Sequence, residues 1–167
     1  MEGMFASWKS RWQETDPSLK AFLLGILFLG VNNGLLNSTF NNYLNDQFHL
    51  SASERGGIEF PREFPGFAII FVTGLLSAFA MRTWAVLVGV FAAIGVGGLG
   101  LLSPTVSMMM IWMCLWSLSD HLFMPVEGAV GLAMAKEGRQ GKRLGQISGY
   151  RYLASILGCG VVWLLAQ

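Results

Sequence analysis

Residues 83–102 read TWAVLVGVFAAIGVGGLGLL and contain no ionisable side chain. A transmembrane helix needs about 20 mostly apolar residues to cross a hydrocarbon core of roughly 30 Å, and this run has that length. The whole chain shares its character, because 53% of the 167 residues are hydrophobic and only 13% are charged. Soluble domains carry about 25% charged residues. The sequence therefore predicts a membrane protein.

Four further apolar runs lie on either side of this stretch. A β-barrel is excluded because its strands alternate apolar and polar residues over about 10 residues, whereas these runs are long and uniformly apolar. The predicted fold is all-α, a polytopic helical membrane domain over residues 19–167 with five transmembrane helices. The predicted spans cover residues 21–43, 56–81, 83–102, 106–135 and 144–166, and the second is entered through a capping box at residues 51–54.

The remaining composition excludes several functional classes. A net charge of +1 is far from the basic footprint of a nucleic-acid-binding protein, so we expect no nucleic-acid partner. Cys114 and Cys159 lie in apolar runs and form no CxxC pair, which favours small buried hydrophobes over redox sites or a disulfide. We expect no cofactor and no catalytic residues, and hence no enzyme.

Lysine and arginine are distributed unevenly between the two sides of the predicted domain. Eight lie in the N-terminal tail or in the connections after the second and fourth spans, and one lies on the other side. The positive-inside rule then places the N-terminus in the cytoplasm, with His49 and Pro104 outside a prokaryotic cytoplasmic (inner) membrane. The eight are Lys9, Arg11, Lys20, Arg82, Lys136, Arg139, Lys142 and Arg143, and the opposite one is Arg55.

The first 18 residues form a separate cytoplasmic segment. Apolar side chains recur there at near-helical spacing with basic residues between them, which suits a short interfacial helix. A disordered tail is the alternative. The apolar residues are Met4, Phe5, Trp8 and Trp12.

Polar side chains share single helix faces within the predicted spans. In the first span, Asn33, Asn37 and Asn41 recur every four residues. Since polar residues in a bilayer usually face a bundle interior or a water-filled cavity, we infer that spans one, two, four and five surround a polar interior. The third packs outside against lipid. The other polar residues are Glu59, Arg62 and Glu63 in the second span, Asp120, His121 and Glu127 in the fourth, and Arg151 in the fifth.

These residues give two geometric expectations. The asparagine face should meet the Glu59 to Glu63 face at the external mouth of a solute path. Asp120 and Arg151 should form an ion pair, because residue counts from the span ends place them at matching depth, and a static structural bridge is the alternative to a functional one. The predicted path is Asn33, Asn37, Glu59, Arg62, Glu63, Asp120, His121 and Arg151, with Asp120 and Glu127 as proton-coupling groups.

Each polar set also has a purely structural interpretation. The asparagines could join neighbouring helices, and residues 59–63 could be a solvated helix end. His121 has no second histidine or cysteine at ligand spacing, so we expect no metal site. The glycines of residues 83–102 predict close helix packing. The solute is either polar or zwitterionic, or it is apolar and bound by Trp112, Trp116, Phe123 and Met124.

The first span ends in Asn41-Asn42-Tyr43-Leu44, Leu50-Ser51 leads to Arg55-Gly56, and a basic connection covers residues 136–145. In these stretches and in its topology, the chain resembles the N-terminal half of a major facilitator superfamily transporter. The family signature G-x-x-x-D-R-x-G-R-R between spans two and three is only partly present. Gly74 and Arg82 fit it, whereas Ala78 replaces its aspartate and Met81 its second glycine.

The resemblance implies secondary active transport, symport or antiport, of a small solute by alternating access. It also implies that spans one, two, four and five flank a central cavity, as the polar pattern indicates. Because such transporters have two six-helix halves, we expect a truncated chain whose partners are the lipid bilayer, the solute and a missing C-terminal half. The alternative is a truncated, non-transporting membrane subunit or interaction partner.

Overall fold

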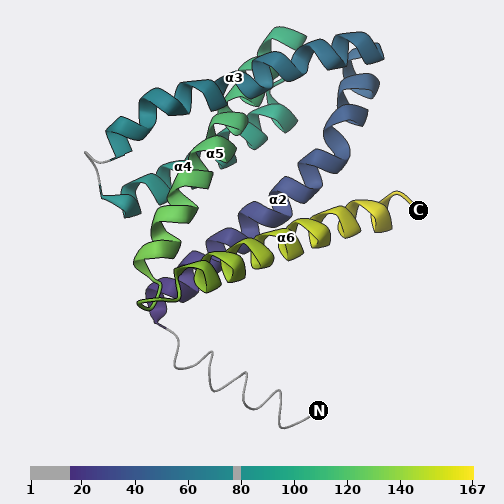
Figure 1. The fold of residues 1–167 in the computed structure, drawn as a ribbon. Helices are drawn as coiled ribbons and strands as arrows, with labels where there is room; N and C mark the ends of the chain where they lie inside the picture. The colour runs from purple at the N-terminus through teal and green to yellow at the C-terminus, as the bar shows by residue number, and fades with distance from the viewer. Residues whose placement is uncertain (1–15, 77–79) are drawn as a thin grey trace.

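A computed structural model describes residues 16–76 and 80–167, and every regular element within them is an α-helix. The all-α prediction is confirmed. The interfacial helix predicted around Trp8 lies outside the described residues, as do residues 77–79 of the partial family signature. The helices are α2 (Pro17–Phe48), α3 (Ala52–Leu76), α4 (Met81–Leu101), α5 (Val106–Ala133) and α6 (Gln140–Leu165) (Figure 1).

Local capping explains where the first two helices begin. The Asp16 carboxylate accepts the backbone N–H of Ser18 at 2.7 Å and of Leu19 at 3.3 Å, and Pro17 occupies the first turn. These hydrogen bonds hold the pKa of Asp16 below its ordinary value, and the bond from Ser18 has the largest effect. The predicted capping box is confirmed, because Ser51 N–H donates to Glu54 at 2.8 Å and Glu54 N–H donates to the Ser51 hydroxyl at 3.3 Å.

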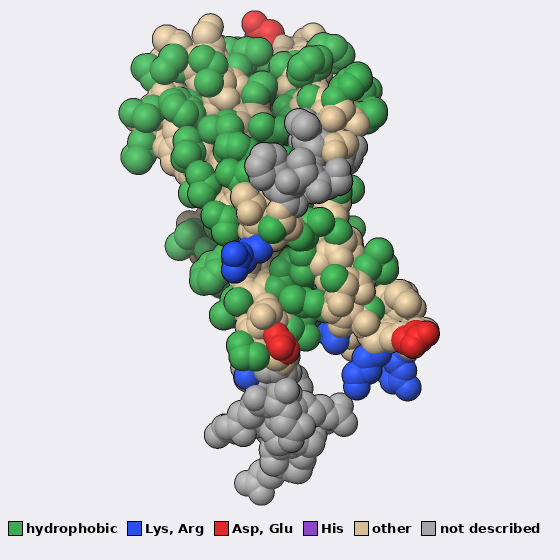
Figure 2. Space-filling view, turned by 90° about the vertical axis from the view of Figure 1, so that its left-hand side faces the viewer, with side chains coloured by type: hydrophobic (Ala, Val, Ile, Leu, Met, Phe, Trp, Pro, Cys, Tyr) green, Lys and Arg blue, Asp and Glu red, His purple; other side chains and the backbone are tan. Residues whose placement is uncertain are grey.

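Four of the five helices, α2, α4, α5 and α6, are long and apolar enough to cross a membrane. This supports a multi-pass membrane protein, and Figure 2 shows hydrophobic side chains over most of one face. The second predicted span is helical as α3, but within the described residues it does not reach the same apolar length, because its first half carries Glu54, Arg55 and residues 59–63. Met81, expected in the second span, instead begins α4.

Glycines allow the closest helix contacts. α2 packs mainly against α6, where a Cβ on Gly34 would collide with the Ser155 carbonyl. α4 packs mainly against α5, where a Cβ on Gly95 would collide with the Trp116 backbone and one on Gly98 with the Trp112 ring. The predicted close packing is thus confirmed for these two glycines of α4. Gly89, Gly97 and Gly100 have no atom within 4 Å of such a Cβ.

Two apolar clusters lie toward opposite ends of the bundle. The first contains Ile26 of α2 and Val126 of α5, and the second contains Phe40 of α2 and Met113 of α5. Between the clusters, α2 carries Asn32 and Asn33, and α5 carries Ser117, Asp120 and His121. The fold therefore places a polar layer near the middle of α2 and α5, between two blocks of apolar packing.

Candidate functional site

The polar layer is centred on one turn of α5. Asp120 lies there, and its Oδ2 accepts a hydrogen bond of 3.3 Å from Nδ2 of Asn33 on α2. The Asn37 amide does not extend this contact, because it donates to the backbone carbonyl of Asn33 within its own helix at 2.9 Å. Of the predicted asparagine face, Asn33 thus reaches the neighbouring helix while Asn37 bonds locally.

His121, the next residue of α5, connects the layer to α3. Its Nε2 lies 3.3 Å from Oε2 of Glu63, and its ring covers Gly66, where any Cβ would collide with it. The Ser117 hydroxyl donates to the backbone carbonyl of Arg62 and also lies 3.2 Å from Nδ1 of His121. The imidazole is thereby fixed on both sides between α5 and α3.

The charged residues of α3 form a short chain leading from this histidine. Arg62 lies 3.1 Å from Glu59 and 3.5 Å from Glu63, and its guanidinium stands 5.9 Å from the Trp116 ring centre. No hydrogen bond or ion pair between described residues links these side chains directly to Asn33 or Asn37. Each face instead bonds to α5, through Asn33 with Asp120 and Glu63 with His121. Among described residues, α2 and α3 are joined directly only nearer their connection, where Arg55 donates to Asn45 at 3.0 Å.

The predicted Asp120–Arg151 ion pair is wrong, because Arg151 of α6 pairs with Glu127 instead. Arg151 Nη1 lies 3.2 Å from Glu127 Oε2, and Asp120 has no ion-pair partner within the described part of the chain. Side chains tilt toward the N-terminus of their own helix, and α5 and α6 run antiparallel. Arg151 therefore leans toward the α5–α6 connection and meets Glu127, whereas Asp120 leans away.

In the Glu127–Arg151 pair the glutamate is buried, the arginine is partly exposed, and one carboxylate oxygen lacks a hydrogen bond. The side chain of Glu127 is 8% exposed and that of Arg151 26% exposed. The second carboxylate oxygen of Glu127, Oε1, has no hydrogen-bond partner among the described residues. One charged oxygen is thus left available inside the bundle, at a place where an unmade hydrogen bond is costly.

A cavity of about 250 Å³ opens between α2, α5 and α6 beside Asp120. Asn33, Asp120, His121 and Arg151 all border it, so it gathers four of the predicted path residues. A second cavity of about 250 Å³ borders Glu127, and Arg151 lines both. Sequence reasoning missed Tyr152 and Ser155, which also line the first cavity. The four-residue spacing between Arg151 and Ser155 was a signal that the two share one face of α6.

The charges around the cavity are not balanced. Arg151 faces Glu127, and His121 faces Glu63, whereas Asp120 has only the Asn33 amide. A carboxylate in this setting can hold a proton or the cationic group of a solute. No three potential metal-ligating side chains converge anywhere in the described ranges.

In comparisons with family models, curated proteins and solved structures, this chain matches none.

Proposed function

We propose that this chain forms the N-terminal part of a secondary active transporter that moves a small polar solute by alternating access. In this proposal α3 also spans the membrane, which makes five transmembrane helices; the bundle belongs to one half of a major facilitator superfamily transporter, and the N-terminus is cytoplasmic in an inner membrane. The observation that carries it is the cavity bordered by Asn33, Asp120, His121 and Arg151 near mid-helix. Secondary transporters bind their substrates near the bilayer midplane.

The energetic cost of the polar layer supports a functional role. Insertion scales assign about 2.5–3.5 kcal/mol to a charged residue at a helix centre. A structural bond between helices needs no charge, as Ser119 shows by donating to the Val88 carbonyl at 2.8 Å. Asp120 instead combines a charged group, a single 3.3 Å hydrogen bond and a cavity wall. That combination favours binding over passive cohesion.

The residues suggest how a proton could be coupled to solute binding. Protonation of the Glu127 carboxylate removes its charge and so weakens its hold on Arg151. The guanidinium, which also lines the cavity of Asp120, is then free to take an anionic group of the solute. Asp120, which lines the same cavity, takes the proton or the cationic group of the solute. The solute class that fits is polar or zwitterionic, and the cavity volume of about 250 Å³ restricts it to small molecules.

A non-transporting membrane subunit is the second candidate, and the exposed apolar faces favour it. On α3, Phe60, Phe64, Phe67 and Phe71 are spaced along one stripe and are 59–82% exposed. A stripe of this kind fits a partner helix as well as it fits lipid. This candidate predicts that the polar layer only holds helices together.

Reconstitution separates the two candidates. The purified chain, alone or joined to a six-helix second half, is placed in proteoliposomes and tested with radiolabelled amino acids, organic cations, organic anions and sugars under a pH gradient. Transport predicts gradient-driven uptake of one class, at least about tenfold lower in Asp120→Asn because the charged group is lost. Asp46→Asn, which alters an exposed acid near the end of α2, is the matched control. Absence of uptake for every class would contradict transport and favour the subunit.

A further inference from the structure

The cavity beside Glu127 extends in the opposite direction from the cavity beside Asp120. It has a volume of about 250 Å³ and lies between α5 and α6, with Leu144, Ile147 and Ser148 in its wall on α6. Leu144 follows the first residue of α6 by four residues, which is about 6 Å along the helix at 1.5 Å per residue. The cavity therefore extends from Glu127 toward the α5–α6 connection, away from Asp120.

The polar groups that line this cavity lack protein partners. Glu127 Oε1 is buried and has no hydrogen-bond partner among the described residues, and neither has the Ser148 hydroxyl of α6. An unmade hydrogen bond at a buried charged oxygen is costly, and ordered water commonly supplies it. A buried water needs about two to four polar partners, and Glu127, Ser148 and Arg151 all line the cavity. Water is therefore the occupant that fits.

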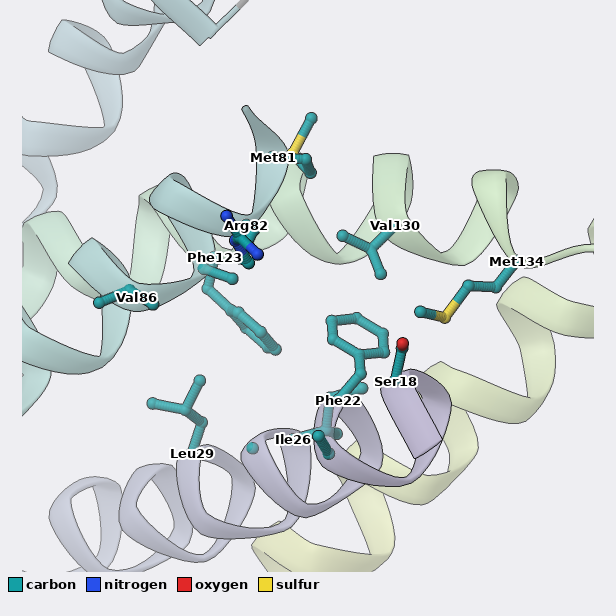
Figure 3. Close-up of a pocket in the computed structure, with 13 residues that line it drawn as sticks. Ser18, Phe22, Ile26, Leu29, Met81, Arg82, Val86, Phe123, Val130 and Met134 are labelled. Atoms are coloured by element: carbon teal, nitrogen blue, oxygen red, sulfur yellow. The ribbon is translucent and has the colours of Figure 1, made fainter. Parts of the chain in front are cut away.

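A larger cavity at the same end of the bundle offers no such path to Glu127. It has a volume of about 620 Å³ and lies where α2 and α4 begin and α5 ends, and in Figure 3 Phe22 and Val130 point into it. Apart from Ser18 and Arg82 its lining is apolar, and it does not include Glu127. Apolar walls give water too few hydrogen bonds to hold it.

We propose that the cavity beside Glu127 is filled with water and is the route by which protons reach this carboxylate from the α5–α6 connection. The inference rests on the coupling role proposed above for Glu127. A hydronium ion in the cavity gives its proton to Oε1 and remains as water, and the carboxylate becomes a neutral carboxylic acid. Arg151 keeps its charge and loses its anionic partner.

Arg151 lies at the boundary between this proton route and the solute cavity. Met124 and Arg151 are the two residues that line both cavities. Arg151 of α6 is also the charged group that faces Glu127. No charged side chain from α2, α3 or α4 lies within ion-pair distance of Glu127 among residues 16–76 and 80–167. A proton arriving from the connection therefore alters one ion pair, and the solute meets the same guanidinium from the other cavity.

Thiol labelling of the full chain in vesicles tests the direction of the route. With Cys114 and Cys159 replaced, Ser148→Cys places a thiol in the cavity wall and Glu137→Cys places one in the exposed connection. A membrane-impermeant reagent that reacts with thiolate in water should label Ser148→Cys from the side that labels Glu137→Cys, and from that side alone. Leu153→Cys, on an apolar face of α6 that is 63% exposed, is the control and should not react. Labelling of Ser148→Cys from both sides, or from neither, would overturn the inference.

A second variant closes the route. Gly128 lines the cavity, and a Cβ there meets no atom within 4 Å, so Gly128→Leu should displace the water without shifting the helices. Gly149→Leu, also in open space but outside the cavity lining, is the matched control. After a pH jump, protonation is followed by the infrared band of the Glu127 carboxylic acid, which is assigned by its absence in Glu127→Gln.

Gly128→Leu should slow the appearance of this band at least about tenfold, and Gly149→Leu should leave the rate unchanged. A wild-type rate in Gly128→Leu, or equal slowing in both variants, would contradict the route. Neither readout needs a solute. Absence of gradient-driven uptake together with one-sided labelling and a slowed band would therefore refute the transport proposal and leave the proton route standing.

Discussion

The Glu127–Arg151 ion pair gives the sharpest energetic prediction. At 3.2 Å and an effective dielectric constant near 20, two unit charges attract by about 5 kcal/mol. Arg151 is 26% exposed, and desolvation offsets much of the attraction. We therefore expect a net coupling energy of roughly 2 kcal/mol between the two side chains. Asp120 and Arg151, which form no ion pair, should couple by less than about 0.5 kcal/mol.

Two double-mutant cycles measure the coupling energies of Glu127 with Arg151 and of Asp120 with Arg151. Glu127→Gln, Arg151→Gln and the double variant form one cycle, and Asp120→Asn replaces the first substitution in the other. The free energy of unfolding is measured in mixed detergent micelles for each variant. Glu127→Gln alone should destabilise more than the double variant, because it leaves the Arg151 charge uncompensated. A larger coupling energy in the Asp120 cycle would refute the assigned pairing.

Three further predictions concern local geometry. Gly34→Ala should destabilise the bundle by about 1–3 kcal/mol in the same unfolding assay, whereas Gly25→Ala should change little, since only the former pushes α6 away. Gly66→Ala should displace the His121 ring, seen as a changed histidine resonance in NMR; an unchanged resonance would contradict the contact. Hydrogen bonds from Ser51 keep the pKa of Glu54 below its ordinary value, so they stabilise the start of α3 above the unfolded-state pKa. The protection factors of the amides there, which are corrected for the pH dependence of intrinsic exchange, should fall as the pH falls through the lowered pKa.

Features that depend on local sequence could be predicted well. Apolar length alone locates the four candidate membrane helices, and the capping box at Ser51 needs only four residues to form. Helix ends were less accurate, because α2 continues beyond the apolar run at both ends, from Pro17 to Phe48. At its start, α2 is extended by the cap in which the Asp16 carboxylate accepts the Ser18 N–H. The hydrophobicity of the apolar run does not predict this hydrogen bond.

Contacts between helices were harder to predict. Counting residues from span ends gives depth along a helix but neglects side-chain tilt. For this reason Asp120 was predicted as the partner of Arg151, whereas the structure shows Glu127. The role of Gly66 could not be inferred at all, since it depends on the His121 ring arriving from another helix. The rule that polar side chains face inward placed Asn33 and Asp120 in the same interior, but it did not predict the hydrogen bond between them.

Thiol accessibility tests most directly whether the polar layer lines a water-filled solute path. With Cys114 and Cys159 replaced, Ser155→Cys places a thiol in the wall of the Asp120 cavity, and Ile156→Cys places one on an apolar face that is 64% exposed. A membrane-impermeant reagent reacts with thiolate in water. Our account predicts that Ser155→Cys is labelled in both right-side-out and inverted vesicles, while Ile156→Cys, facing lipid, is not. Equal reactivity of the two cysteines, or no labelling of Ser155→Cys from either side, would contradict it.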